Sequence, residues 1–230
     1  MSDDLRILFL HIPKTGGISL FQALSKAMID KKSLRFADGS NENRNKYINM
    51  SIDEIRKYHL LSGHFPLHFF LKQPIDDYKV ITLLREPIDR ELSAFFYMKT
   101  WKKHPMHHKI NCMDLYQFLD HRKGEGVNRQ CWQICGQMSF EKARKVIDDQ
   151  VYLAAPVEHL QRFCRVLESR LGLPTIDLKH ENKTAFRLKA EEIHPDIIAR
   201  FRSQSEEDLK LYQYVKEKFE RETLGTSQGS

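Results

Sequence analysis

The stretch RILFLHIPKTGGIS, at residues 6–19, decides the fold expected of this chain. Its first half is a nearly continuous apolar run that ends at Pro13, as is typical of a strand buried on both faces of a parallel sheet. From Gly17 onward, apolar residues recur every three or four positions as far as Met28, which predicts a helix with one apolar stripe. The sequence therefore predicts a strand, a tight loop and a helix in immediate succession.

The loop between these two elements, residues 13–19, has the composition of an anion-binding site and is called the anion loop below. Its glycines let main-chain amides approach an anion, and the amino end of the following helix carries partial positive charge. The residues expected to contact the anion are Lys14, Thr15, Gly16, Gly17, Ile18 and Ser19. The lysine precedes the glycines, whereas it follows them in the P-loop of nucleoside triphosphatases. Taken alone, the loop also fits an ordinary turn with an exposed lysine.

A second strand and helix carry a second set of anion-binding side chains. The run at 78–84 predicts a buried strand, and Pro87 suits the first turn of the helix that follows it. Arg85 stands at the end of the strand and Ser93 about two turns into the helix, where both side chains can converge on one anion. Singly, Arg85 suits an ion pair and Ser93 a hydrogen bond within its own helix. Together with the anion loop, they indicate a ligand with two separated anionic ends.

In both motifs the chain resembles the carbohydrate sulfotransferases related to heparan sulfate 2-O-sulfotransferase. The resemblance implies that the anion loop holds the 5'-phosphosulfate of 3'-phosphoadenosine 5'-phosphosulfate (PAPS) and that Arg85 and Ser93 hold its 3'-phosphate. The product nucleotide is then 3'-phosphoadenosine 5'-phosphate (PAP). The resemblance also implies that His64, in a Gly-His pair some twenty residues before Arg85, is the catalytic base, with Lys14 stabilising the leaving side. Some family members use a glutamate as base, which makes Glu54 the alternative.

Two later segments resemble other parts of the same family's site. Residues 128–136 resemble a segment that lines the acceptor cleft, although a packed helix end with Trp132 and Cys135 buried fits them equally well. Residues 180–184 resemble a loop that closes over the nucleotide. The contacts implied there come from Asn182, Lys183 and Thr184.

The remaining histidines and the cysteines are expected to take no part in catalysis. His11, His59 and His68 are interpreted as structural or exposed. The adjacent His107 and His108 cannot easily share one helix face, and no recurrent ligand spacing surrounds them, so we expect no metal. Four cysteines without a Cys-x-x-Cys pair indicate reduced thiols.

Length and charge suit one compact domain with anionic ligands, since the chain has 230 residues and a net charge of +6. We expect a single sulfotransferase domain at 1–222 and a flexible tail at 223–230. Strands that alternate with helices predict an α/β fold with a doubly wound central parallel sheet, a P-loop-like anion loop, helices on both faces and a helical C-terminal third. No signal peptide or membrane-spanning run is recognisable, so we expect a cytoplasmic protein. The oligomeric state stays open.

The resemblance implies a hydroxyl-bearing acceptor, which can be a carbohydrate, a lipid or a small molecule. We expect acceptor specificity in residues 30–49, where no regular element is predicted, and in residues 100–130. A P-loop-like small-molecule kinase is one alternative, but it needs a Walker A order and an acidic magnesium site that the sequence lacks. A non-catalytic polyanion-binding protein is another. Basic residues are scattered among acidic ones and no nucleic-acid-binding module is recognisable, so nucleic acid is not an expected partner.

Overall fold

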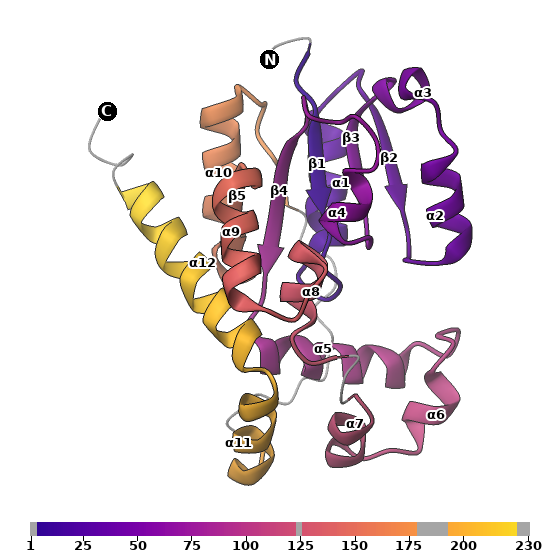
Figure 1. Ribbon diagram of the computed structural model, residues 1–230, viewed down its shortest axis with the longest axis vertical. Helices are drawn as coiled ribbons and strands as arrows, with labels where there is room; N and C mark the ends of the chain where they lie inside the picture. The colour runs from indigo at the N-terminus through magenta and orange to yellow at the C-terminus, as the bar shows by residue number, and fades with distance from the viewer. Residues whose placement is uncertain (1–3, 123–125, 179–192, 225–230) are drawn as a thin grey trace.

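The computed structural model describes residues 4–122, 126–178 and 193–224, which form a parallel sheet flanked by helices (Figure 1). The strands are β1 (Ile7–Leu10), β2 (Lys32–Phe36), β3 (Tyr58–Gly63), β4 (Lys79–Leu84) and β5 (Leu153–Pro156). Their order across the sheet is β2-β3-β1-β4-β5, and every neighbouring pair is parallel. The chain builds one side of β1 first and then crosses to the other, so the expected doubly wound α/β fold is confirmed.

Helices cover both faces of the sheet. They are α1 (Gly17–Ala27), α2 (Asn41–Ile48), α3 (Ile52–Arg56), α4 (Leu67–Phe70), α5 (Pro87–Thr100), α6 (His107–Asn111), α7 (Leu115–His121), α8 (Arg129–Cys135), α9 (Phe140–Gln150), α10 (Leu160–Leu171), α11 (Pro195–Gln204) and α12 (Glu206–Leu224), with a short 3-10 turn at Val157–His159. Helices α1 and α10 pack on one face, whereas α4, α8 and α9 pack on the other. Helix α12 runs along the β5 edge, and α5 lies across the end toward which the strands point (Figure 1). Among the described residues, no helix is both long and apolar enough to cross a membrane.

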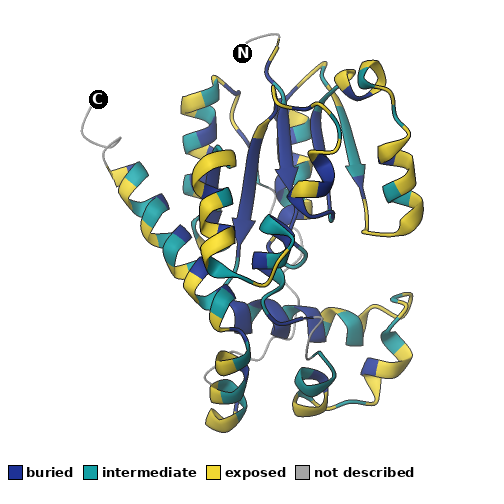
Figure 2. Cartoon of the chain, viewed as in Figure 1, coloured by how far each residue is buried: buried dark blue, intermediate teal, exposed yellow. Residues whose placement is uncertain are grey.

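Successive residues of β1 divide between the two faces of the sheet. Leu8 and Leu10 belong to the core under α4, α8 and α9, while Ile7 and Phe9 belong to the core under α1 and α10. All four side chains are fully buried, as the dark central strands of Figure 2 show. Burial on both faces is why this stretch of sequence is apolar without interruption.

The segment at 30–49 contains two regular elements that the sequence did not predict. Strand β2 forms an edge of the sheet beside β3, and Ser40 caps α2 by accepting a hydrogen bond from the main-chain N–H of Asn43. Within this segment, Phe36 and Tyr47 alone are buried. So few buried positions leave no apolar period that could indicate a strand or a helix.

The C-terminal helix extends past the expected domain boundary at residue 222. Helix α12 continues to Leu224, and Thr223 is buried with its hydroxyl donating to the carbonyl of Phe219 at 2.6 Å. The polar sequence after Arg221 gave no sign of this burial. The boundary predicted for the tail therefore falls inside the helix.

An aromatic cluster packs around the residue that follows the Gly-His pair. The cluster consists of Phe36, Tyr47, Phe65, Phe69 and Phe70. Phe65 is fully buried at its centre, with ring centroids 5.0 Å from Phe69 and 5.2 Å from Phe36. Because Phe65 directly follows His64, the cluster anchors the chain where β3 ends.

Replacing Phe65 with alanine should lower the free energy of unfolding by about 3–5 kcal/mol, because the substitution leaves a cavity among four other rings. Denaturant titration of the purified variant measures the loss. Ile29 is 66% exposed, and Ile29→Ala serves as the control, with an expected change within about 0.5 kcal/mol. A loss below about 1 kcal/mol for Phe65→Ala would contradict the anchoring role of the cluster.

Candidate active site

The carboxyl ends of β3, β1 and β4 bring the three sequence motifs to one edge of the sheet. In the parallel register, Leu10 of β1 pairs with Gly63 of β3 and with Thr82 of β4. The anion loop follows β1, His64 follows β3 and Arg85 follows β4. The connections from β1 and β4 lead to opposite sides of the sheet, which makes this edge a topological switch point of the kind where α/β folds bind ligands.

The anion loop turns sharply and leaves the first turn of α1 without a side-chain cap. Lys14 and Gly16 have φ values of 72° and 78°, a left-handed conformation that is uncommon for a lysine. The buried Thr15 hydroxyl donates to the carbonyl of Ile12 at 2.8 Å and stabilises the turn. Gly16 is the N-cap of α1, and the first turn contains no acidic residue. The amides of that turn are therefore donors suited to an anion.

Arg85 connects the two predicted anion-binding motifs. Its Nη1 atom donates a hydrogen bond to the carbonyl of Lys14 at 3.0 Å. The Lys14 ammonium in turn lies 3.8 Å from the ring centroid of Tyr97 on α5, within the range of a cation–π contact. Ser93 is half-buried on the second turn of the same helix. The structure thus places the Arg85 guanidinium against the main chain of Lys14, a contact that the sequence did not predict, and α5 carries Ser93.

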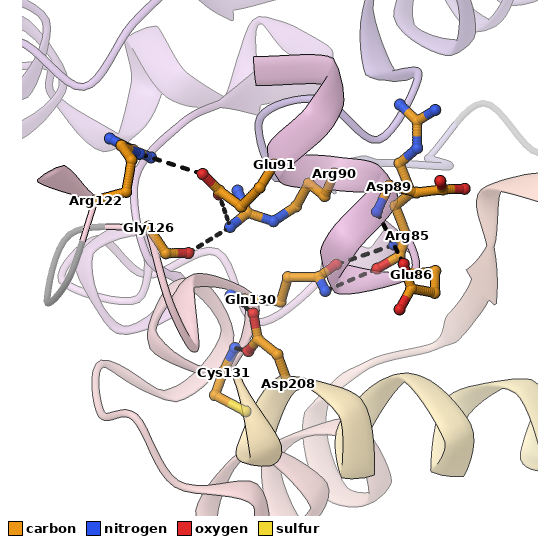
Figure 3. A network of polar contacts seen from close by, with 10 residues as sticks. All are labelled: Arg85, Glu86, Asp89, Arg90, Glu91, Arg122, Gly126, Gln130, Cys131 and Asp208. Atoms are coloured by element: carbon orange, nitrogen blue, oxygen red, sulfur yellow. Dashed lines mark hydrogen bonds and ion pairs between the residues drawn. The ribbon is translucent and has the colours of Figure 1, made fainter. Parts of the chain in front are cut away.

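Gln130 of α8 holds the main chain of Arg85 through both of its polar groups (Figure 3). Its Oε1 accepts from the Arg85 N–H at 3.0 Å, and its Nε2 donates to the Arg85 carbonyl at 2.8 Å. Asp208 of α12 accepts from the N–H groups of Gln130 and Cys131 at 3.0 and 2.8 Å. Asp208 is buried, and this burial raises the pKa of its carboxyl group. Two helices distant in sequence therefore fix the position of Arg85.

The sequence interpretation missed the role of Gln130. Residues 128–136 fitted either a lining of the acceptor cleft or a packed helix end, and Gln130 contributes instead to the support of Arg85. No signal in the sequence indicated this role, because the full burial of Gln130, which requires its amide to have partners, is seen only in the structure.

A buried ionic network joins α5 to the segment before α8. Arg90 donates to the Glu91 carboxylate and to the Gly126 carbonyl, and Arg122 donates to the other Glu91 oxygen at 3.2 Å (Figure 3). The side chain of Glu91 is fully buried. The Arg90 guanidinium is therefore paired with the Glu91 carboxylate inside the protein, and Arg90 is a structural residue.

Two histidines meet at the ends of β1 and β3. His64 Nε2 lies 3.1 Å from His11 Nδ1, and the two rings are nearly perpendicular, with centroids 4.5 Å apart. The interpretation of His11 as a structural or exposed residue missed this contact. The parallel pairing of β1 with β3 places each histidine directly after a strand of the same buried pair, and spacing along the chain does not encode this proximity.

Both imidazoles are neutral at ordinary pH. Burial lowers the pKa of His64 to about 4, with Arg35 and Arg129 adding to the effect and Asp38 opposing it. Burial is also the largest cause that lowers the pKa of His11 well below its ordinary value. A neutral imidazole keeps one lone pair and can accept a proton.

The other predicted site residues lie elsewhere. Glu54, the alternative base, is exposed at the start of α3, where its carboxylate accepts from the Ser51 N–H at 2.8 Å in a capping box. No group of three or more histidine, cysteine or acidic side chains in the described ranges could hold a metal ion. All four cysteines fall in those ranges and are free thiols. The predicted contacts at Asn182, Lys183 and Thr184 lie outside the described residues.

A parallel sheet with a glycine-containing loop leading into a helix at its switch point is the architecture of α/β proteins that bind phosphorylated ligands. The family model described as the sulfotransferase family matches residues 1–215, and the chain belongs to that family. A search of curated proteins gave no match.

Two solved structures share the fold at low sequence identity. A mouse sulfotransferase complexed with PAP has a TM-score of 0.50 and 14% identity, over 89% of this chain and 64% of the mouse chain. A sulfotransferase from Alicyclobacillus acidocaldarius has a TM-score of 0.51 and 16% identity, over 91% of this chain and 95% of the bacterial chain. The present chain thus spans less than two thirds of the mouse protein, and these similarities show the fold.

The lowered pKa of His64 should be visible by NMR as a titration midpoint near pH 4 in the nucleotide-free protein, instead of near the 6.5 of an unfolded chain. Because the unfolded chain then binds more protons between these values, this histidine makes the free energy of unfolding fall as the pH drops from about 6.5 to about 4. The imidazole NMR signal that disappears in the His64→Gln variant is the signal of His64. A midpoint at pH 6 or above would refute the burial effect.

Proposed function

We propose that this sulfotransferase moves a sulfuryl group from PAPS to a hydroxyl group of an acceptor. The supporting observation is that two anion-binding units follow adjacent strands and are joined by the hydrogen bond from Arg85 to the Lys14 carbonyl. PAPS has two separated anionic ends, which match these two units. The mouse sulfotransferase with the shared fold was solved with PAP, which supports the same nucleotide here.

The hydrogen-bond donors and cations at the carboxyl ends of β1 and β4 fit such a nucleotide. The amides at residues 16–19 hold the 5'-phosphate, and Arg85 and Ser93 hold the 3'-phosphate. Lys14 leaves the Tyr97 ring to stabilise negative charge on the leaving side. PAPS supplies the activated sulfuryl group, and the protein supplies alignment and charge.

His64 takes the proton from the acceptor hydroxyl. It is neutral in the free protein and already has a lone pair at neutral pH. An anion bound at the neighbouring loop favours the imidazolium form, so binding of the nucleotide should raise the pKa of His64 toward the range suited to a general base.

The acceptor is a hydroxyl-bearing molecule, and we extend to it the proposed relation to carbohydrate sulfotransferases. Asn182, Lys183 and Thr184 complete the proposed nucleotide contacts. Incubation of the protein with isotopically labelled PAPS and a panel of sugars, lipids and small alcohols, read by mass spectrometry, tests the function. Labelled sulfate ester and calorimetric binding of PAP are the expected results. Tight binding of magnesium ATP without PAP binding, or salt-sensitive polymer binding without any transfer, would reject the proposal.

Substitution of His64 by alanine should lower kcat by about 100-fold or more, because positioned bases contribute roughly that factor. The dissociation constant of PAP should stay within about twofold, since His64 contacts the acceptor side. His68→Ala is the matched control, because His68 lies exposed on α4, and it should keep full activity. Full activity of His64→Ala would exclude His64 as the base.

Substitution of Gln130 by leucine should weaken PAP binding by about tenfold, because the main chain of Arg85 loses both hydrogen bonds and its guanidinium loses its alignment. Gln133 provides a matched control on the same helix, since it is equally buried and its amide atoms have no hydrogen-bond partner in the described structure. Gln133→Leu should leave PAP binding unchanged. Equal PAP affinities of the two variants, measured by calorimetry, would show that Gln130 does not support the nucleotide site.

A further inference from the structure

His11 and His64 form one unit built by the sheet. The main-chain N–H of His11 donates to the Gly63 carbonyl at 3.2 Å, which continues the parallel ladder one residue beyond the pair Leu10 and Gly63. The residue that directly follows β3 is His64, and its Nε2 then lies 3.1 Å from His11 Nδ1. Strand pairing therefore sets the distance between the two imidazoles.

The His11 ring is also fixed on its remaining sides. It is 3% exposed and stacks on the ring of Phe9, with an interplanar angle of 15°. Its Cδ2–Nε2 edge lies against Gly17, where a Cβ atom would come within 2.1 Å of Cδ2 and 2.2 Å of Nε2. A glycine at the first position of α1 therefore makes room for this imidazole, which links the proposed base to the anion loop.

The proton between the two rings determines which atom of His64 can act as a base. If His64 Nε2 carries it and donates to His11 Nδ1, then His64 keeps its lone pair on Nδ1, free for a third molecule. In the opposite arrangement, His11 Nδ1 donates to Nε2, and a neutral His64 has its proton on Nδ1 and no lone pair to offer. The first arrangement alone leaves a functional base.

We infer that His11 is a positioning residue that accepts a hydrogen bond from His64 Nε2 and so makes His64 Nδ1 the atom that takes the acceptor proton. The inference rests on the proposed function of His64. During proton transfer the acceptor O–H bond breaks as the Nδ1–H bond forms, and the resulting imidazolium keeps its Nε2–H bond to His11. His11 then carries its own proton on Nε2, at the edge that contacts Gly17.

The charges around the pair suit a neutral partner for His64. Arg35 of β2 and Arg129 of α8 face His64 and disfavour its imidazolium form, while Asp38 favours it, and Lys14 acts on His11 in the same sense as the arginines. In a Ser-His-Asp triad a carboxylate both orients the histidine and stabilises its imidazolium. Here an imidazole supplies orientation without adding negative charge.

Nitrogen-15 NMR of the wild-type protein, with the resonances assigned by His64→Gln, tests the tautomer directly at pH 7. The inference predicts a protonated Nε2 and an unprotonated Nδ1 on His64, and a protonated Nδ1 would overturn it. This readout needs no acceptor and no turnover. If the tautomer is as expected but labelled PAPS yields no product with any acceptor, the proposed function fails while the pairing stands.

Three substitutions separate positioning from packing. His11→Leu removes the acceptor atom, His11→Gln places its amide near the position of Nε2, and His11→Asn restores a polar atom near the position of Nδ1. We expect kcat to fall about 10–100-fold in the leucine and glutamine variants and to recover in the asparagine variant, with PAP affinity unchanged throughout. Equal kcat in His11→Leu and wild type would overturn the inference. If a variant does not fold, the tautomer of His64 measured by NMR in the wild-type protein decides whether the inference holds.

Discussion

The parallel pairing of β1 with β3 on one side and β4 on the other is the constraint on which the site depends. Because Leu10 pairs with both Gly63 and Thr82, the three strands end at one level. The Thr82 hydroxyl donates to the Leu10 carbonyl at 2.9 Å, which adds a side-chain hydrogen bond between β4 and β1 where β1 ends. A shift of register would separate the anion loop from Arg85 and His11 from His64.

Buried polar groups then fix side chains that the sheet alone would leave free. A polar group removed from water is costly unless it is hydrogen-bonded, so each partner of Arg85 needs a partner of its own. Gln130 satisfies the Arg85 main chain, and Asp208 satisfies the main chain of Gln130. The C-terminal helix thus contributes to the site through α8, although none of its own residues was predicted to bind a ligand.

The sequence predicted the elements whose residues are buried in a regular pattern. β1, α1, β4 and α5 followed from apolar runs and periods, and the two motifs proposed to bind anions were recognised by their places after those strands. β2 and α2 could not be predicted in this way, because Phe36 and Tyr47 are their only buried residues. The pairing of His11 with His64 and the support of Arg85 by Gln130 depend on contacts between distant segments. Spacing along the chain does not encode such contacts.

The most direct measurement compares the affinities of PAP and adenosine 5'-phosphate, which differ in the 3'-phosphate alone, for the wild type and for Arg85→Ala. If the two anion-binding units hold one nucleotide, the wild type should bind PAP about 10–100-fold more tightly, and Arg85→Ala should lose most of this preference. A wild type that binds both nucleotides equally, or an Arg85→Ala variant that keeps the full preference, would contradict a two-ended nucleotide site.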